Sequence, residues 1–387
     1  MREVAVVGVG MTKFGPSEKT NVELFSEASM EAIAESGISP RDVQALFLGN
    51  VFGGFEEGQV TLSAYAAADI GIPYIPTTRF EGACASGSIA IRDAFIWVAS
   101  GMYDIVLAGG TEKALAMGTP YATRTFAMGS DSRYEGPTGV TFPGIFAMMT
   151  HLCAKKYGVP LQKLKNQMAG VAVKNHRNGT FHPKAHFRKE ITPETVFNSI
   201  MVADPLQLFD CCPFSDGAAA VVLASAETAK KLVERPVYFA GVGQCSAPPL
   251  TNQKDITRVR AREESAKQAY SMAGLGPKDI DFCEVHDCFT IAEIAATEGL
   301  GFFDFGEGGN GAERGETKIG ARIPVNPSGG LKARGHPIGA TGAAQVYEVA
   351  KQLRGECGER QVEGAKTAMT DTLGADLSMV CNMIFRI

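Results

Sequence analysis

Cys84 is the residue of this chain best placed for covalent chemistry. It lies in a run of small residues, Gly82-Ala-Cys-Ala-Ser-Gly87, which leaves room for a ligand to reach the sulfur. From Ile91 to Ala99 apolar residues recur at helical spacing, so we expect a helix that begins at Cys84. The N–H groups and partial positive charge of a helix N-terminus favour a thiolate and stabilise an oxyanion. This segment predicts a cysteine nucleophile, and a small buried cysteine in a tight strand-to-helix turn is the alternative.

A histidine, His336, lies in a second segment of the same design, Asn326–Gln345. In both segments a glycine follows the reactive residue by three positions, and a helix of small residues continues into an apolar face. A nucleophile and a base on equivalent turns of two similar halves could face each other across the junction. Two unrelated glycine-rich turns are the alternative, but that interpretation leaves unexplained why each turn presents a reactive side chain at the same point.

Four motifs together resemble the thiolases, in particular the sterol-carrier-protein-type and archaeal acetyl-CoA acetyltransferase branch. In chain order they are Glu81-Gly-Ala-Cys-Ala-Ser-Gly-Ser88, Val285-His-Asp-Cys-Phe-Thr290, Asn326-Pro-Ser-Gly-Gly330 and Gly335-His-Pro-Ile-Gly-Ala-Thr-Gly342. Four motifs in the family's order are far more specific than any one of them. Membership of a superfamily does not by itself fix the reaction.

The resemblance implies an α/β thiolase fold, in which duplicated βαβαβαββ halves form a five-layered α-β-α-β-α sandwich. The pattern agrees, because strands such as Val4–Val9 alternate with helices such as Val22–Ser36, which indicates a helix-flanked, largely parallel sheet. Strand Ile105–Gly110 contains only apolar and glycine residues, which is typical of a strand covered on both faces. We expect residues 1–110 and 214–234 to form the N-terminal half, 111–213 an inserted loop domain, and 235–387 the C-terminal half.

The same resemblance assigns roles to three residues of the first reaction step. Cys84 would carry the acyl group, and His336 would take its proton and donate to a thioester oxygen. An imidazole beside a helix-terminal thiol gives a thiolate near neutral pH. Gly374 would donate its backbone N–H, together with that of Cys84, to the acyl-enzyme oxyanion.

His286 and Cys288 would serve the second substrate. The alternation of a strand end places them on one face with Asp287 opposite. By resemblance, His286 helps to bind the thioester oxygen, and Cys288 is the acid/base that moves the carbon-bound proton. Most thiolases carry that cysteine near the C-terminus, where this chain has Thr372. Cys381 lies in an apolar run, and we interpret it as structural.

The remaining histidines and cysteines give little sign of metal binding. His176, His182 and His186 lack carboxylate or cysteine partners at helical spacing, so we expect a solvated or phosphate-facing loop rather than a metal site. The odd number of cysteines, nine, without a repeated Cys-x-x-Cys pattern, argues against a disulfide framework and a structural zinc site. The adjacent Cys211 and Cys212 are interpreted as two small apolar residues.

Composition favours a small ligand. The formal charge of −5 and the absence of a long basic run argue against a nucleic acid or an anionic membrane as the main partner. The expected substrates are coenzyme A thioesters, with no permanently bound cofactor. The chain begins directly with a strand and has no apolar run long enough to cross a bilayer, so we expect a cytoplasmic protein.

These features favour an acyl-CoA C-acyltransferase, either an acetyl-CoA acetyltransferase or a 3-ketoacyl-CoA thiolase. It would work through a Cys84 acyl-enzyme and a Claisen condensation or its reverse. A thiolase-like C-acyltransferase or aldolase subunit acting on another acceptor within a complex, or a non-catalytic scaffold subunit, are the alternatives.

The resemblance also implies partners. A homodimer or homotetramer is expected, because in the thiolases the sheet edge before the nucleophile pairs across a two-fold axis. Strand Ile105–Gly110 and the stretch Tyr74–Glu81 are poor in charge, as such a contact requires. Archaeal-type relatives can also join a zinc-ribbon/OB-fold protein and a hydroxymethylglutaryl-CoA synthase.

Overall fold

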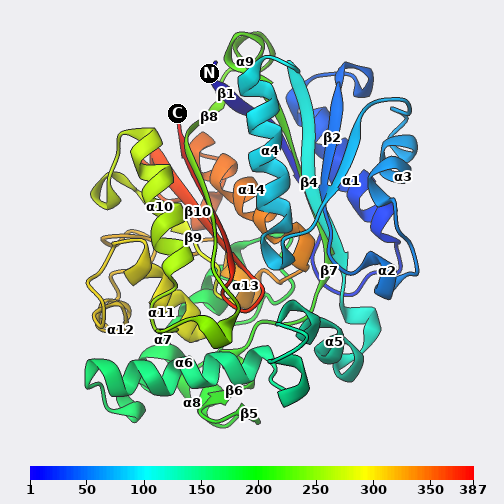
Figure 1. Ribbon diagram of the computed structural model, residues 1–387. Coiled ribbons are helices and arrows are strands. Elements are labelled where there is room, and N and C mark those ends of the chain that lie inside the picture. The colour runs from blue at the N-terminus through cyan, green and yellow to red at the C-terminus, as the bar shows by residue number, and fades with distance from the viewer.

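A nine-stranded mixed sheet organises the chain in the computed structural model, which describes residues 1–387 (Figure 1). The strands lie in the order β3-β2-β4-β7-β1-β8-β11-β10-β9. Their bounds are β1 Val4–Met11, β2 Ala45–Gly49, β3 Thr77–Phe80, β4 Ile105–Lys113, β7 Asp216–Ser225, β8 Val237–Ser246, β9 Phe282–Glu284, β10 Thr367–Gly374 and β11 Met379–Arg386. A separate two-stranded sheet pairs β5 Met201–Ala203 with β6 Leu206–Gln207.

The strand order reveals the duplication. In the first half, the first strand (β1) lies at the centre of the sheet, and the fifth, fourth, second and third strands (β7, β4, β2 and β3) follow it outward. In the second half, the first strand (β8) again lies at the centre, and the fifth, fourth and second strands (β11, β10 and β9) follow it outward in the same order. The two half-sheets meet at β1 and β8, through the pairs Ala5↔Tyr238 and Val6↔Val237. The third strand of the second half is reduced to a single pairing of Val325 with Cys283. Pro324 and Pro327 flank that residue, and proline lacks the N–H that a longer ladder needs.

Helices cover both faces of each half-sheet. Their bounds are α1 Asn21–Ser36, α2 Gly53–Glu56, α3 Leu62–Asp69, α4 Ser86–Ser100, α5 Thr119–Phe126, α6 Phe142–Tyr157, α7 Leu161–Phe181, α8 Pro193–Phe197, α9 Ala226–Leu232, α10 Arg260–Ala273, α11 Thr290–Gly299, α12 Gly308–Glu313, α13 Gly330–Ala333 and α14 Thr341–Arg354. No helix is both long enough and apolar enough to span a bilayer.

The main apolar cluster contains α4, α14 and one face of both half-sheets. The other face of the first half-sheet packs on α1 and α3, and that of the second half-sheet packs on α10 and α11. This arrangement confirms the predicted five layers, with α4 and α14 in the middle (Figure 1).

The two central helices approach most closely where each begins. A Cβ atom at Gly87 would collide with the carbonyl oxygen of Gly339, and one at Gly342 would collide with Ser88. Glycine is therefore required on both helices, and this close contact brings the two reactive turns together.

The edge of the sheet differs in one respect from the expectation. β4 lies between β2 and β7, so strand Ile105–Gly110 is internal and cannot supply an edge contact. β3, within the stretch Tyr74–Glu81, is the outermost strand of the first half.

Between β4 and β7 the chain forms α5 to α8 and the small sheet. α7 packs against α11, α12 and α13 of the second half. The histidine-rich segment after α7 is only in part the solvated loop expected from its polarity. Arg188, Lys189 and Glu190 are exposed, but His182 is fully buried against Glu348, with 3.5 Å between Nε2 and Oε2. Lys184 pairs with Glu31 at the surface of the first half. These partners anchor the segment to both halves.

Candidate active site

Three of the predicted site residues converge where the two halves meet. Cys84 lies in the single 3-10 turn Ala83–Ala85 that leads into α4, His336 precedes the equivalent turn before α14, and His286 follows β9. The Cys84 sulfur and one ring nitrogen from each histidine lie within 4.8 Å of one another. The His286 and His336 rings meet edge to face, with their centroids 5.2 Å apart. Cysteine and histidine at this spacing can also bind a soft metal ion such as Zn²⁺, and this is the one such group in the chain.

The turn that carries Cys84 is held in an uncommon conformation. Ala83 has a φ of 48°, in the left-handed region, which is unfavourable for any residue other than glycine. The Ala83 N–H donates to the Glu81 carboxylate at 2.7 Å, and the Ser86 hydroxyl donates to the Ala83 carbonyl at 2.6 Å. These bonds fix the backbone that presents the sulfur.

His336 is held in one tautomer. The Thr341 hydroxyl donates to the Pro337 carbonyl oxygen at 3.0 Å, so its own oxygen accepts the proton of His336 Nδ1, 2.6 Å away. Nε2 is then the unprotonated nitrogen. The backbone N–H of His336 donates to the Ser215 hydroxyl oxygen, which also contacts Nδ1 of His186 at 2.9 Å.

Burial keeps the nucleophile and its base neutral in the free protein. It raises the pKa of the Cys84 thiol to about 12, with a further contribution from Glu112, while N–H groups of Ala375 and of Cys84 itself lower that pKa. Burial, and then Arg334, lower the pKa of His336 to about 3. Burial therefore opposes the thiolate near neutral pH that the helix N-terminus was expected to favour. Proton transfer from sulfur to imidazole must accompany the attack.

Cys288 follows His286 by two residues, and its thiol is near enough to that of Cys84 for their charges to interact. It is 8% exposed, and burial raises its pKa well above the ordinary value, as do the neighbouring Cys212 and Cys84 thiols. Asp287 is committed elsewhere, since it accepts hydrogen bonds from the Leu331 N–H and the Asn175 amide.

Cys212 was missed as a neighbour of the site. Its backbone N–H donates to the Cys288 carbonyl oxygen at 2.9 Å, and the Cys84 and Cys288 thiols are near enough for their charges to interact with it. Cys212 and Cys288 are far apart in the sequence, so no local pattern signals this proximity.

Gly374 packs on the turn that carries Cys84. A Cβ atom there would lie 2.5 Å from the Gly82 carbonyl oxygen and 3.3 Å from the Cys84 nitrogen, so only glycine fits. The following residue, Ala375, has a φ of 55° and directs its N–H to the Cys84 sulfur. This wall of the site is thus made of backbone from the end of β10.

Thr372 and Cys381 are structural. The buried Thr372 hydroxyl donates to Gln345 at 2.7 Å and contacts the Ser88 hydroxyl at 2.6 Å, so it links α14 to α4. Cys381 is fully buried in the central apolar cluster. Neither side chain is free to exchange a proton with a substrate.

A cavity of about 250 Å³ opens beside Cys84. Its lining consists of Val51, Phe52, Phe55, Glu81, Ala83, Cys84, Phe126, Met128, Gly129, Phe142 and Ile338. These residues come from the first half, the insertion and the turn before α14, so the cavity has a place for a group bonded to the sulfur.

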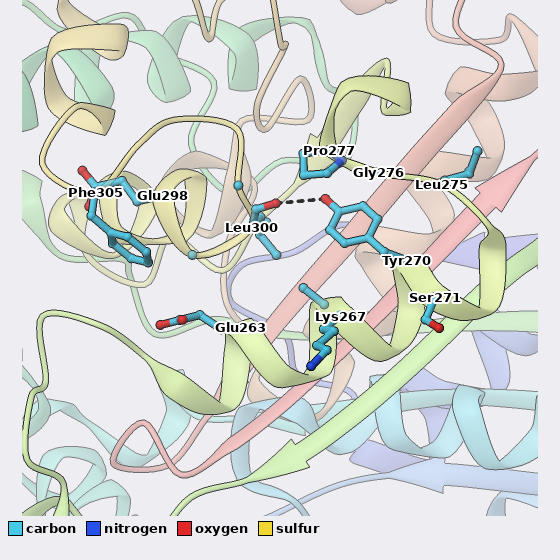
Figure 2. A pocket seen from close by; sticks show the side chains of 13 residues that line it. Glu263, Lys267, Tyr270, Ser271, Leu275, Gly276, Pro277, Glu298, Leu300 and Phe305 are labelled. Atoms are coloured by element: carbon cyan, nitrogen blue, oxygen red, sulfur yellow. Dashed lines mark hydrogen bonds between the residues drawn. The ribbon is translucent and has the colours of Figure 1, made fainter.

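A larger hollow of about 470 Å³ lies between α10 and the segment after α11 (Figure 2). The Tyr270 hydroxyl donates to the Leu300 carbonyl oxygen across it at 3.0 Å. Burial raises the pKa of Glu298, which also lines it, to about 6. No predicted site residue borders this hollow.

Comparison with known proteins agrees with this geometry. Residues 4–227 match the family model "Thiolase, N-terminal domain", and residues 243–387 match "Thiolase C-terminal domain-like". The acetyl-CoA acetyltransferase of Methanothermobacter thermautotrophicus is 47% identical over 97% of this chain and 97% of its own. The benzoylsuccinyl-CoA thiolase subunit BbsB of Thauera aromatica is 39% identical over 96% of this chain and 95% of its own.

A solved structure of an "Ltp2-ChsH2(DUF35) aldolase" superposes with a TM-score of 0.84 at 25% identity, covering 99% of this chain and 97% of that chain. The family models for both halves, the duplicated reactive turns and the relatives that match over nearly the whole chain all indicate the same family. The chain belongs to the thiolase family.

Proposed function

We propose that this thiolase transfers acyl groups between coenzyme A thioesters through an acyl-enzyme on Cys84. The observation that carries the proposal is the convergence of the Cys84 sulfur with ring nitrogens of His286 and His336, within 4.8 Å, at the wall of a cavity. A thiol, a neutral imidazole and backbone N–H groups are the set that acyl transfer to sulfur requires.

In the first step the Cys84 sulfur forms a bond to the thioester carbonyl carbon while its proton passes to Nε2 of His336. The carbonyl oxygen becomes an oxyanion, which the Cys84 N–H and the Gly374 N–H stabilise. When the tetrahedral adduct collapses, the bond from the carbonyl carbon to the leaving group breaks. Cys288 gives its proton to that group, which is coenzyme A for an acyl-CoA or the acyl-CoA carbanion for a 3-ketoacyl-CoA, while His336 keeps the proton taken from Cys84.

In the second step of condensation, the Cys288 thiolate left by that proton transfer removes a proton from the carbon next to the carbonyl of a second thioester. His286 and His336 donate hydrogen bonds to the oxygen that gains charge. The carbanion attacks the acyl carbon, the bond from that carbon to Cys84 breaks, and His336 returns the proton to the Cys84 sulfur as a 3-ketoacyl-CoA leaves. The same residues in reverse order perform thiolysis.

Coenzyme A-dependent cleavage of a 3-ketoacyl-CoA by the purified chain tests this proposal. We expect cleavage, and we expect one acyl mass on the Cys84 peptide when an acyl-CoA is supplied alone. The Cys84→Ala variant should lose both. An acyl label on Cys288, Cys212 or Cys381 of the wild-type chain would overturn the assignment.

An aldolase or C-acyltransferase subunit that uses another acceptor is the second candidate. The structural neighbour at a TM-score of 0.84 is named as an aldolase, and the Thauera relative is named as a subunit. A chain that loads Cys84 but does not cleave 3-ketoacyl-CoA, and that co-purifies with a second protein from its host, would favour this candidate.

The proposal includes a cytoplasmic two-fold oligomer, with β3 as the edge that pairs between copies. The carbonyl oxygens of Pro76 and Phe80 accept hydrogen bonds from β2 and from the residue after it. Because backbone groups alternate in direction along a strand, those of Thr77 and Arg79 face away from β2. The proposed zinc-ribbon/OB-fold protein and hydroxymethylglutaryl-CoA synthase rest on family resemblance. Recovery of a fully active thiolase alone from the host would count against an obligate partner.

A further inference from the structure

The walls of the cavity at Cys84 are almost entirely apolar. Four phenylalanines, Phe52, Phe55, Phe126 and Phe142, line it together with aliphatic and methionine side chains. Its one ionisable group besides the thiol is Glu81, whose carboxylate already accepts the Ala83 N–H. The cavity therefore offers a polar or charged acyl group nothing to replace its lost water.

The aromatic wall is preformed. The Phe52 and Phe126 rings stack with centroids 5.1 Å apart, and Phe214 supports Phe126 edge to face at 4.9 Å. Phe52 and Phe126 are 8% and 7% exposed, so their positions are fixed by packing. They come from the segment after β2 and from α5, so the first half and the insertion build the wall jointly.

Apolar side chains also extend to the mouth. Phe55 is 49% exposed and Met128 is 58% exposed, and both border the cavity. An apolar ligand that reached the mouth would remove both side chains from water.

The size of the cavity gives the size of the group. An apolar protein cavity of about 150 Å³ holds a benzene molecule. The cavity here has about 250 Å³, so it holds a ring together with the carbonyl that joins it to sulfur. An acetyl group would fill only a small part of this volume.

We propose that the acyl group received by Cys84 is a bulky apolar one, about the size of a phenylacetyl or hexanoyl group, rather than acetyl. This inference rests on the proposed acyl-enzyme function and adds the substrate class to it. Each methylene group buried in an apolar site strengthens binding, here of the transition state for acyl transfer, by about fourfold. Four additional carbons, partly buried, should favour hexanoyl over acetyl transfer by about 10- to 100-fold.

The test is single-turnover loading of the purified wild-type chain, followed by intact mass. Phenylacetyl-CoA, hexanoyl-CoA and acetyl-CoA are supplied separately, and the second-order rate of Cys84 acylation is compared. We expect both bulky thioesters to load about 10- to 100-fold faster than acetyl-CoA. Acetyl loading as fast as the other two would overturn the inference and leave the acyl-enzyme intact. Loading by none of the three would contradict the proposed function itself.

A pair of variants locates the effect. Met128→Trp adds bulk at the mouth of the cavity and should lower the preference for phenylacetyl-CoA over acetyl-CoA by at least about fivefold. Met148→Trp makes the same substitution at a similarly exposed methionine of α6 that does not line the cavity. It should leave the preference unchanged. An equal change in both variants, or a preference that survives Met128→Trp in full, would place selectivity outside this cavity.

Discussion

Nδ1 of His336 lies 2.6 Å from the hydroxyl oxygen of Thr341, the first residue of the central helix α14. The Thr341 proton is committed to the Pro337 carbonyl oxygen, so the threonine can only accept from the imidazole. The helix that positions the base thereby also selects the nitrogen that is free to take the Cys84 proton.

Thr341→Val should slow acylation of Cys84 by about 10- to 100-fold. The valine removes the acceptor, and a buried N–H without a partner costs about 1–3 kcal/mol, which shifts the imidazole toward the tautomer that cannot act as the base. Rapid-quench acylation measures the effect, and KM for the acyl-CoA should change little. Thr341→Ser should restore the rate. Normal acylation by a folded Thr341→Val chain would show that the contact is only structural.

Cys288→Ser should still load an acyl group on Cys84 but lose α-proton exchange and turnover by about 10²- to 10⁴-fold, the usual worth of a positioned acid/base. The Cys288 thiol is near enough to those of Cys84 and Cys212 for their charges to interact, whereas Cys381 is fully buried in the central apolar cluster. Deuterium exchange of an acyl-CoA, followed by mass spectrometry, is the measurement. Cys381→Ser is the matched control and should cost stability only. The reverse phenotypes would assign the proton transfer to β11.

Alkylation of Cys84 by iodoacetamide should rise steadily with pH. The pKa of this thiol is raised to about 12, so the thiolate fraction grows roughly tenfold per pH unit throughout the range from about 7 to 10. The rate is read from the mass of the Cys84 peptide. A plateau below about pH 8 would mean that a thiolate is already present in the free protein.

The duplicated reactive turns could be predicted from the sequence, because the glycines that each turn requires lie close to its reactive residue in the chain. Gly87 and Gly342 stand where a side chain would strike the opposite central helix, and each lies within a few residues of a reactive group. Strand and helix periodicity also located β1, α1 and β4 to within a few residues of their observed bounds.

The features that could not be predicted from the sequence depend on contacts between residues that are far apart in the chain. The polar segment around His182 and Lys184 resembles a solvated loop until Glu348 and Glu31, far away in the chain, are placed beside it. The helix start at Cys84 was visible, but the larger effect of burial on its pKa was not, because the groups that exclude water come from several elements.

Thr77→Pro should weaken the proposed two-fold oligomer without disturbing the sheet. The Asn50 N–H donates to the Phe80 carbonyl and the Leu46 N–H donates to the Pro76 carbonyl, so the Thr77 backbone faces outward on β3. Proline there removes only an outward N–H, which an edge strand tolerates. Light scattering at micromolar concentration should show a dimer or tetramer for the wild-type chain and a smaller species for the variant. Thr251→Ala, in an exposed turn between β8 and α10, is the control and should leave the mass unchanged. A wild-type monomer, or a Thr77→Pro chain of unchanged mass, would rule out pairing through this edge.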